Sequence, residues 1–520
     1  MRGASLPPIT DPRIARPFLE KFQSNFRFRL YTRLVNELQT RTGTHYSPTV
    51  SRLRGTPRII VQDAFTGGSA QADQLSTENH IQFHDALTLS SGNHIIKAGV
   101  TSPDISRRGM SDRTNTDGTY SFSSLRDYEL GKPFSFAMQS GDGHIAVWQE
   151  ELGVFFQDDF RVRPNLSTGA GVRWDWQNFI SDRNNVAPRL SIAYSLGRGR
   201  KTVLRAGACY FYDKTGWRPG ADVLRFDGKH LRQMLLQNPS FPNPWADGGQ
   251  IHSAPANISR FAGDVRNPYS IQYSFGVERQ IGRQTTISAN YIASKGTKLF
   301  RSRDLNAPPP PYSGRPDPGV AVLRQFESSA SQRTHGVEVT MRGRFTRFFN
   351  GTVQCSLGSA KNDTGGIYSF PADNYDLSKE WGRADFDQRH RLNLAGSFKA
   401  SSWFNLGILF EAYSGRPYEL TVGRDLNQDG YASDRPAGVR RNSLEGLGGK
   451  TLDLHWGRDF PLDRSRKEKG PVLTVALDAS NVLNTVNYTS MVGNLSSPFF
   501  GQAVASAPAR RLQLAERFRF

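Results

Sequence analysis

The last eleven residues, Arg510 to Phe520, alternate between apolar and polar side chains with one exception. The apolar positions share one phase and are Leu512, Leu514, Phe518 and Phe520. A period of two predicts a β-strand whose two faces meet different surroundings. Its length also matters, because a tilted strand of about 9 to 11 residues crosses the hydrocarbon layer of a membrane. The exception, Glu516, falls in the apolar phase and would point toward lipid.

The same alternation recurs along the chain. From Tyr269 to Val277, the odd positions are apolar or aromatic and the even positions are small or polar. Comparable runs cover residues 189–196, 337–342 and 404–411. Each run is followed by turn-forming residues, as expected of strands that are apolar on one face. About sixteen strands are predicted in this way, the first of them spanning Phe26 to Leu34.

The connections between these runs alternate in length with few exceptions. Short turns are predicted at residues 90–93, 163–165, 198–200, 282–284, 346–350 and 400–402. Long links cover residues 35–80, 101–146, 213–268, 296–334, 359–389, 414–450 and 484–509. Soluble sandwiches have no reason to collect their long loops at one end. The pattern predicts an all-β fold, an antiparallel transmembrane β-barrel with short periplasmic turns and long extracellular loops.

The composition is compatible with such a barrel. Hydrophobic residues make up 37% of the 520 residues and the mean hydropathy is −0.53, which excludes a bundle of transmembrane helices. A barrel tolerates this polarity because only every second strand residue faces lipid. The two cysteines, Cys209 and Cys355, are too few for a disulfide scaffold or a cysteine-based zinc cluster.

Several long phrases resemble TonB-dependent outer-membrane receptors, and most closely the Oar-like group. They are FQDDFRVRPNLSTGAGVRWDW at 156–176, NNVAPRLSIAYSLGRGRKTVLRAGACYFYD at 184–213, NPYSIQYSFGVERQI at 267–281, FDQRHRLNLAGSF at 386–398 and DASNVLN at 478–484. The resemblance implies a regulatory-like domain and a plug before a barrel of about 22 strands. It also implies that the outer loops bind a scarce nutrient, which is imported with energy from an inner-membrane TonB complex.

The beginning of the sequence departs from this family pattern. It reads MRGASLPPITDPR, without the basic start, apolar core and cleavage site of a secretory signal. We expect an irregular segment over residues 1–25 and a receptor-like barrel over residues 26–520, with the signal peptide, plug and TonB box absent. About sixteen strands would leave an open sheet, whose unpaired edges are costly in hydrocarbon. An N-terminally truncated receptor is therefore expected.

The net charge of +19 raises the question of nucleic-acid binding. The basic residues are dispersed, however, and we expect no nucleic-acid partner. Five arginines occupy the polar phase of predicted strands and would line a lumen: Arg189, Arg205, Arg342, Arg391 and Arg517. Five others lie in predicted outer loops: Arg301, Arg303, Arg435, Arg440 and Arg441. Lipopolysaccharide phosphates or an anionic cargo would account for them equally well.

One predicted loop contains a candidate metal site. Asp425, Asn427 and Asp429, followed by Gly430, reproduce the opening D-x-N-x-D-G of a calcium loop. The twelfth position holds Pro436 instead of Glu, so Asp434 would have to supply the last ligand. The same residues are also typical of a polar hairpin tip, and we favour that interpretation. A structural calcium ion stays the alternative, and no other cofactor is expected.

Catalytic motifs have little support. Asp385, Asp387 and His390 are close in sequence, but a structural role fits a loop that returns into a strand better than general-base chemistry does. We predict a non-enzymatic protein of the bacterial outer membrane that contacts lipid and lipopolysaccharide and takes up an unidentified nutrient. A passive pore or a structural or adhesion barrel is the alternative function.

Overall fold

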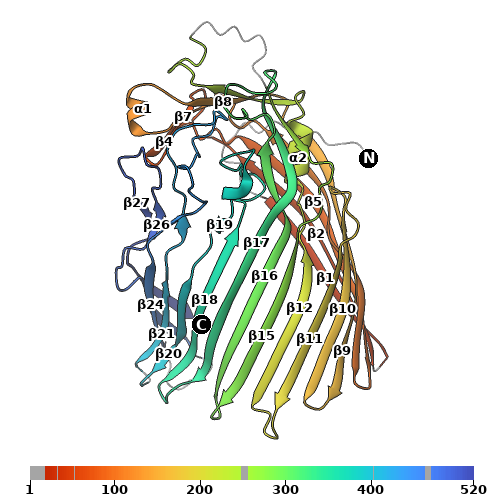
Figure 1. Ribbon diagram of the computed structural model, residues 1–520. Coiled ribbons are helices and arrows are strands. Elements are labelled where there is room, and N and C mark those ends of the chain that lie inside the picture. Colours follow the sequence, from red (N-terminus) through yellow and green to blue (C-terminus); the bar gives the residue numbers. More distant parts are fainter. Residues whose placement is uncertain (1–17, 32, 52, 247–255, 402, 463–469) are drawn as a thin grey trace.

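Within the described part of the chain, seventeen long antiparallel strands form the wall of the molecule. The computed structural model describes residues 18–520 except 32, 52, 247–255, 402 and 463–469 (Figure 1). In order of pairing, the wall strands are β1 (Phe18–Tyr31), β2 (Leu34–Thr49), β5 (Gln74–Ser91), β6 (His94–Asp112), β9 (His144–Arg163), β10 (Leu166–Gln177), β11 (Val186–Leu196), β12 (Thr202–Tyr212), β15 (Tyr269–Ile281), β16 (Thr285–Asp304), β17 (Val320–Arg344), β18 (Phe349–Asn362), β20 (His390–Lys399), β21 (Asn405–Tyr413), β24 (Gly449–Pro461), β25 (Val472–Ser480) and β28 (Arg511–Arg519). The antiparallel barrel fold predicted from the sequence is confirmed.

The register of the wall keeps one phase apolar from strand to strand. Leu514 lies opposite Leu477, and Leu477 in turn lies opposite Trp456. These side chains do not meet in a core, since Leu512 and Leu514 are 67% and 64% exposed. Large apolar side chains exposed across a whole wall are those that lipid covers. We therefore assign the apolar phase to the outward face and the polar phase to the lumen.

The connections follow the predicted asymmetry. The six predicted short turns each join two adjacent wall strands, and in Figure 1 the turns gather at the lower end of the wall while the long loops gather at the upper end. The sequence predicts about sixteen strands, and the described residues form seventeen wall strands. The first predicted strand, Phe26 to Leu34, runs from β1 into the start of β2, and the predicted 35–80 link was wrong where it covered the rest of β2 and the start of β5. The sequence between these two strands is only Thr32 and Arg33, without a Gly, Pro, Asn or Asp that would mark a break.

The described sheet begins within the segment that was expected to be irregular. β1 starts at Phe18, inside residues 1–25, and residues 1–17 lie outside the described residues. β1 pairs with β2, and β28 pairs with β25. No pairing joins β1 to β28 among the residues that the structure describes. These two strands are therefore the edges of the described sheet.

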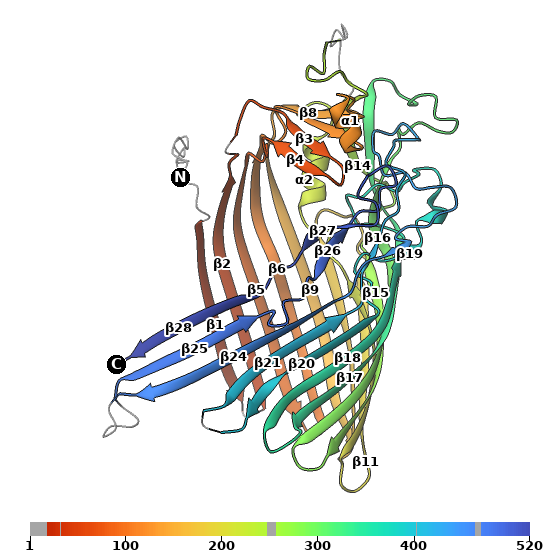
Figure 2. The same ribbon diagram turned by 90° about the vertical axis from the view of Figure 1, so that its left-hand side faces the viewer.

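The long loops form a second, folded layer at the upper end of the wall (Figures 1 and 2). Its first part contains β3 (Arg58–Val61), β4 (Phe65–Gly68), β7 (Thr119–Phe122), α1 (Leu125–Glu129), β8 (Ser135–Gly141), α2 (Arg218–Arg225), β13 (Leu231–Gln237) and β14 (Ala256–Phe261). Its second part contains η2 (Leu377–Lys379), β19 (Gly382–Arg383), β22 (Pro417–Tyr418), β23 (Leu444–Glu445), β26 (Tyr488–Met491) and β27 (Ala503–Ser506). We call these segments together the loop layer.

The buried apolar clusters of the described residues lie at this end of the molecule. One unites Val61, Tyr120, Phe122 and Phe136 from β3, β7 and β8. The other unites Met110 and Val147 at the upper ends of β6 and β9 with Trp217 and Ala221 at α2. The loop layer is thus packed like a small soluble domain, whereas the wall is a single sheet. None of the described helices has both the length and the apolar character needed to cross a membrane.

Candidate functional site

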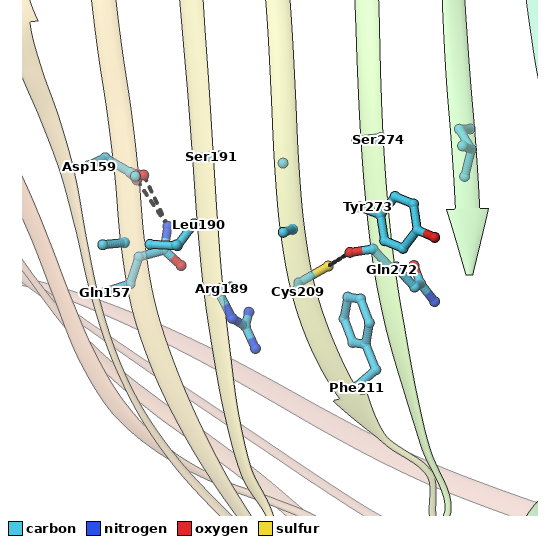
Figure 3. Close-up of a pocket in the computed structure, with 15 residues that line it drawn as sticks. Gln157, Asp159, Arg189, Leu190, Ser191, Cys209, Phe211, Gln272, Tyr273 and Ser274 are labelled. Atoms are coloured by element: carbon cyan, nitrogen blue, oxygen red, sulfur yellow. Dashed lines mark hydrogen bonds between the residues drawn. The ribbon is translucent and has the colours of Figure 1, made fainter. Parts of the chain in front are cut away.

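A hollow of about 450 Å³ lies in the wall between β9 and β16 (Figure 3). Its lining comes mainly from the lumen phase of five adjacent strands and includes Gln157, Asp159, Arg189, Cys209, Phe211 and Gln272. Glycine deepens it: a Cβ at Gly169 would lie 2.6 Å from Ser191 Oγ. Amide, carboxylate and guanidinium groups therefore surround a space that a side chain at Gly169 would partly fill.

The polar groups of this hollow are only partly paired with each other. Gln157 Nε2 donates to both oxygens of Asp159 at 3.1 and 3.2 Å, and Cys209 Sγ lies 3.9 Å from the carbonyl oxygen of Gln272. Arg189, which the sequence placed in the lumen phase, is half-buried in the lining of the same hollow. The arrangement can offer hydrogen bonds to a passing polar solute.

The loop layer brings the candidate calcium residues together. Asp425 Oδ2 accepts a hydrogen bond from Gly430 N at 2.8 Å, and Asp434 Oδ2 accepts one from Leu426 N at 2.7 Å. Asn427 Oδ1 and Asp425 Oδ1 both accept from Asp429 N at 3.1 Å. Side-chain oxygens of the 425–434 loop therefore accept hydrogen bonds from its own backbone, which is compatible with both the polar-turn and the calcium-loop interpretations.

Burial changes the acidity of these carboxyl groups. Asp429 is 2% exposed. Desolvation and then repulsion from Asp425 raise its pKa to about 8. Desolvation also raises the pKa of Asp434 to about 6, and it raises the pKa of Asp425. Within the described part of the chain, no group of three or more His, Cys, Asp and Glu side chains is arranged to hold a metal ion. Calcium binding at Asp425, Asn427, Asp429 and Asp434 stays a prediction.

Most of the outer-loop arginines that the sequence analysis named form ion pairs with carboxylates of the protein itself. Arg301 pairs with Asp363 at 2.9 Å, Arg303 pairs with Glu327, and Arg441 pairs with Asp385 at 2.8 Å. Arg435 is held between Glu380 and Glu419. Arg440 is exposed. Four of the five are thus already occupied by carboxylates, which is a different role from contact with lipopolysaccharide or an anionic cargo.

The two carboxylates near residue 387 also bind neighbouring segments. Asp387, which is 2% exposed, accepts from Ala360 N at 2.8 Å and from Arg383 Nε at 2.6 Å. Asp385 accepts from Arg441 and from Asn442. The carboxylates therefore fix the loop against neighbouring segments.

Segments that are far apart in the sequence meet in the loop layer. Asn494, 3% exposed, donates through Nδ2 to the carbonyl oxygen of Ser123 at 3.0 Å, next to the start of α1. Gln237 Nε2, at the end of β13, donates to the carbonyl oxygen of Gln428. The loops of the N-terminal and C-terminal strands are therefore joined to each other at this end of the wall.

A second group of polar residues was missed in the sequence. Asp112, Asp222, Arg225, Gln233, Arg324 and Tyr368 line a cavity of about 230 Å³ within the loop layer. These residues come from β6, α2, β13, β17 and the loop after β18. Because they belong to no local motif and five separate segments supply them, no sequence signal could have joined them.

Comparison with known proteins agrees with the fold. Residues 21–185 and 178–439 match the family described as outer membrane beta barrel domain. The curated Escherichia coli K12 protein YddB, described as uncharacterized, is 23% identical over 152 residues, which cover 29% of this chain and 16% of YddB. The crystal structure of the outer membrane transporter YddB from Escherichia coli matches with a TM-score of 0.66 at 14% identity, covering 96% of this chain and 62% of that chain.

Two further receptors share the architecture at lower similarity. The ferric enterobactin receptor PfeA of Pseudomonas aeruginosa matches with a TM-score of 0.56 at 14% identity, covering 95% of this chain and 60% of PfeA. The ferric-catecholate import receptor Fiu of Escherichia coli K12 matches with a TM-score of 0.53 at 9% identity, covering 97% of this chain and 64% of Fiu. The chain thus spans less than two thirds of the length of these solved relatives. Together with the strand pattern, the family match shows that the chain belongs to the outer membrane beta barrel domain family and is a transmembrane β-barrel of the bacterial outer membrane.

Proposed function

We propose that the chain is the barrel of a TonB-dependent receptor of the Oar-like group, which takes up a scarce nutrient across the outer membrane with energy from an inner-membrane TonB complex. The observation that carries the proposal is the loop layer. It is folded around two apolar clusters, and it links distant loops through buried contacts such as Asn494 with Ser123. A receptor needs such a shaped outer surface to select one solute before import, whereas a general diffusion pore does not.

Two further features support this proposal. The long phrases between residues 156 and 484 resemble the Oar-like group, and the solved proteins of similar fold include transporters and receptors. The lumen phase carries polar groups along the wall, including Arg205 with Glu278 at 3.7 Å and Arg391 with Glu411 at 3.6 Å. A polar solute would find hydrogen-bonding groups along this path.

Energised import can be tested without knowing the nutrient. The source strain, a strain deleted for the gene and the deletion strain carrying the gene would be grown in the same medium, with and without a protonophore. Mass spectrometry would follow which solutes are depleted. We expect at least one solute whose depletion requires both the gene and the proton gradient. Depletion that requires the gene but not the gradient would instead identify a passive pore.

A passive pore or a structural or adhesion barrel is the second candidate. Exposed polar side chains in the lumen phase, such as Arg205 and Gln272, favour a water-filled interior. Conductance of the purified chain in a planar bilayer separates the candidates, because a pore would conduct ions steadily and an adhesion barrel would show neither conductance nor solute depletion.

We also propose calcium as a structural ion of the 425–434 loop. The charge of the loop supports it: besides desolvation, Asp425 and Asp434 both raise the pKa of Asp429, and an ion held with Asn427 would offset the repulsion among the three carboxylates. Calorimetry with calcium chloride on the parent chain and on Asp429→Ala tests this proposal. Equal calcium uptake by both proteins would show that the loop does not bind the ion.

A further inference from the structure

Arg324, at the upper end of β17, is a partly buried arginine without a carboxylate of its own. Its Nη1 donates to Ser302 Oγ at 3.0 Å and to the carbonyl oxygen of Tyr368 at 2.9 Å. The two acids that interact with it at longer range are engaged elsewhere: Asp222 pairs with Arg225, and Asp304 pairs with Arg315 at 2.8 Å. Among the described residues, no carboxylate oxygen lies within 4.0 Å of the Arg324 guanidinium. This distinguishes it from Arg301, Arg303, Arg435 and Arg441.

Aromatic rings hold the guanidinium in place. Its Cζ lies 4.2 Å from the centroid of the Phe370 ring and 6.0 Å from that of Tyr368. This part of β17 pairs with β14 in the loop layer, outside the membrane-spanning part of the strand. Burial lowers the pKa of Arg324 from its ordinary value, which shows that the charged group has lost water.

The edge of the guanidinium is left for a ligand. Stacking fixes the plane of the group and leaves its edge for planar, bidentate partners. Here Nη1 is used, while Nε and Nη2 donate to no described residue. Arg324 therefore presents two unused nitrogen donors.

The cavity beside Arg324 is small and polar. Its volume of about 230 Å³ is below the ~300 to 1,000 Å³ of sites for drug-sized ligands, so it fits a compact molecule or one end of a larger one. Asp112, Asp222, Arg225 and Arg324 give the lining two negative and two positive charges. Amide groups of Gln139, Gln233 and Asn257 complete it. Such a neutral lining suits a carboxylate on a small polar molecule better than a multiply charged phosphate.

We propose that this cavity binds the carboxylate of a compact polar molecule, with the free edge of Arg324 as its anchor. The inference rests on the proposed receptor function and names the chemical class that the loop layer recognises. Guanidinium and carboxylate groups match in a two-bond, charge-assisted geometry. Arg225 carries less uncompensated charge, because its two Nη atoms already pair with Asp112 and Asp222, and only its buried Nε has no partner among the described residues.

The test is calorimetric titration of the purified chain in detergent with glycine, acetate and lactate as carboxylate probes, and with inorganic phosphate. The parent chain is expected to bind at least one carboxylate, and Arg324→Gln is expected to weaken that binding about tenfold or more. Arg324→Lys keeps the charge but not the planar edge, so a smaller loss is expected. Arg232→Gln is the matched control, because this exposed arginine on β13 lies next to the lining residue Gln233.

Thermal unfolding of each variant would be measured first, so that only folded proteins are compared. Carboxylate binding that is equal in the parent chain and Arg324→Gln would overturn the proposal, as would tighter binding of phosphate or no carboxylate binding by the parent. The solute-depletion experiment reports separately on transport. If depletion did not need the proton gradient while Arg324→Gln still abolished carboxylate binding, energised import would be wrong and this site would stand.

Discussion

Replacing Asp429 by Asn should remove a pH dependence that the buried carboxyl group imposes on the loop layer. The pKa of Asp429 is raised from 3.8 to about 8, first by desolvation and then by Asp425. Between these two values, the folded protein binds a proton that the unfolded chain has released. The contribution of protonated Asp429 to the free energy of unfolding is therefore fully present below about pH 4 and is lost as the pH rises through 8. The amide introduced by Asp429→Asn would keep the shape and the acceptor oxygen without the titration.

The magnitude follows from the size of the shift. One pKa unit corresponds to about 1.4 kcal/mol, so about four units correspond to roughly 5 to 6 kcal/mol lost between pH 4 and pH 8. This figure is an upper bound, because water that enters the loop would relieve part of the desolvation. Asp434, whose pKa is raised to about 6, adds a loss of the same sign between pH 4 and pH 6.

The assay is urea unfolding of the barrel in detergent at pH 4.5, 6.0 and 8.0, with EDTA present so that no calcium offsets the charge. Limited proteolysis of the 414–448 loop would detect a purely local effect. The parent should become less stable than Asp429→Asn by several kcal/mol as the pH rises. Asp213→Asn, at an exposed loop carboxylate, is the control and should follow the parent. Parallel pH profiles for the parent and Asp429→Asn would refute the reasoning.

Three further predictions concern the wall and the loop layer. Glu516→Leu should raise the yield of folded barrel, measured by heat-modifiable gel migration, because Glu516 shares the outward face and lies opposite Val475; a lower yield would contradict the face assignment. Leu514→Arg should destabilise the barrel by about 2 to 4 kcal/mol in lipid, whereas the lumen-phase control Gln513→Arg should have little effect; urea unfolding in liposomes measures both. Asn494→Ala leaves the carbonyl oxygen of Ser123 without its buried partner and should cost about 1 to 3 kcal/mol locally, seen as faster proteolysis of the loops while the wall stays intact.

The wall could be predicted from the sequence because one local rule governs it. Every strand residue faces either lipid or the lumen. Apolar and polar side chains therefore alternate within each segment, as in Tyr269 to Val277 within β15. The short turns carry Gly and Asn, as Gly282 does at 282–284 and Asn350 does at 346–350. The missed break at 32–33 carries neither, and for that reason the first predicted strand ran on to Leu34 while the rest of β2 was assigned to the 35–80 link.

The loop layer could not be predicted in the same way, because its contacts join residues from unrelated segments. Ser123 and Asn494 are 371 positions apart, and Arg324 meets Phe370 only because β17 extends beyond the wall. The 425–434 loop is the exception. Its D-x-N-x-D-G motif is local, so the sequence predicts that these side chains share one loop, although it could not show how deeply Asp429 is buried.

Different forces hold the two parts of the molecule, and this has a consequence for transport. Backbone hydrogen bonds between neighbouring strands hold the wall together, and lipid offers the backbone N–H and C=O groups no alternative partners. The loop layer is held by small apolar clusters and by buried ion pairs, such as Arg435 with Glu380 and Glu419. Buried ion pairs add little net stability, but they are strongly destabilising when one partner is removed. A ligand carboxylate at Arg324 would add one more partner to this network, so it could shift the loops without any change in the register of the wall.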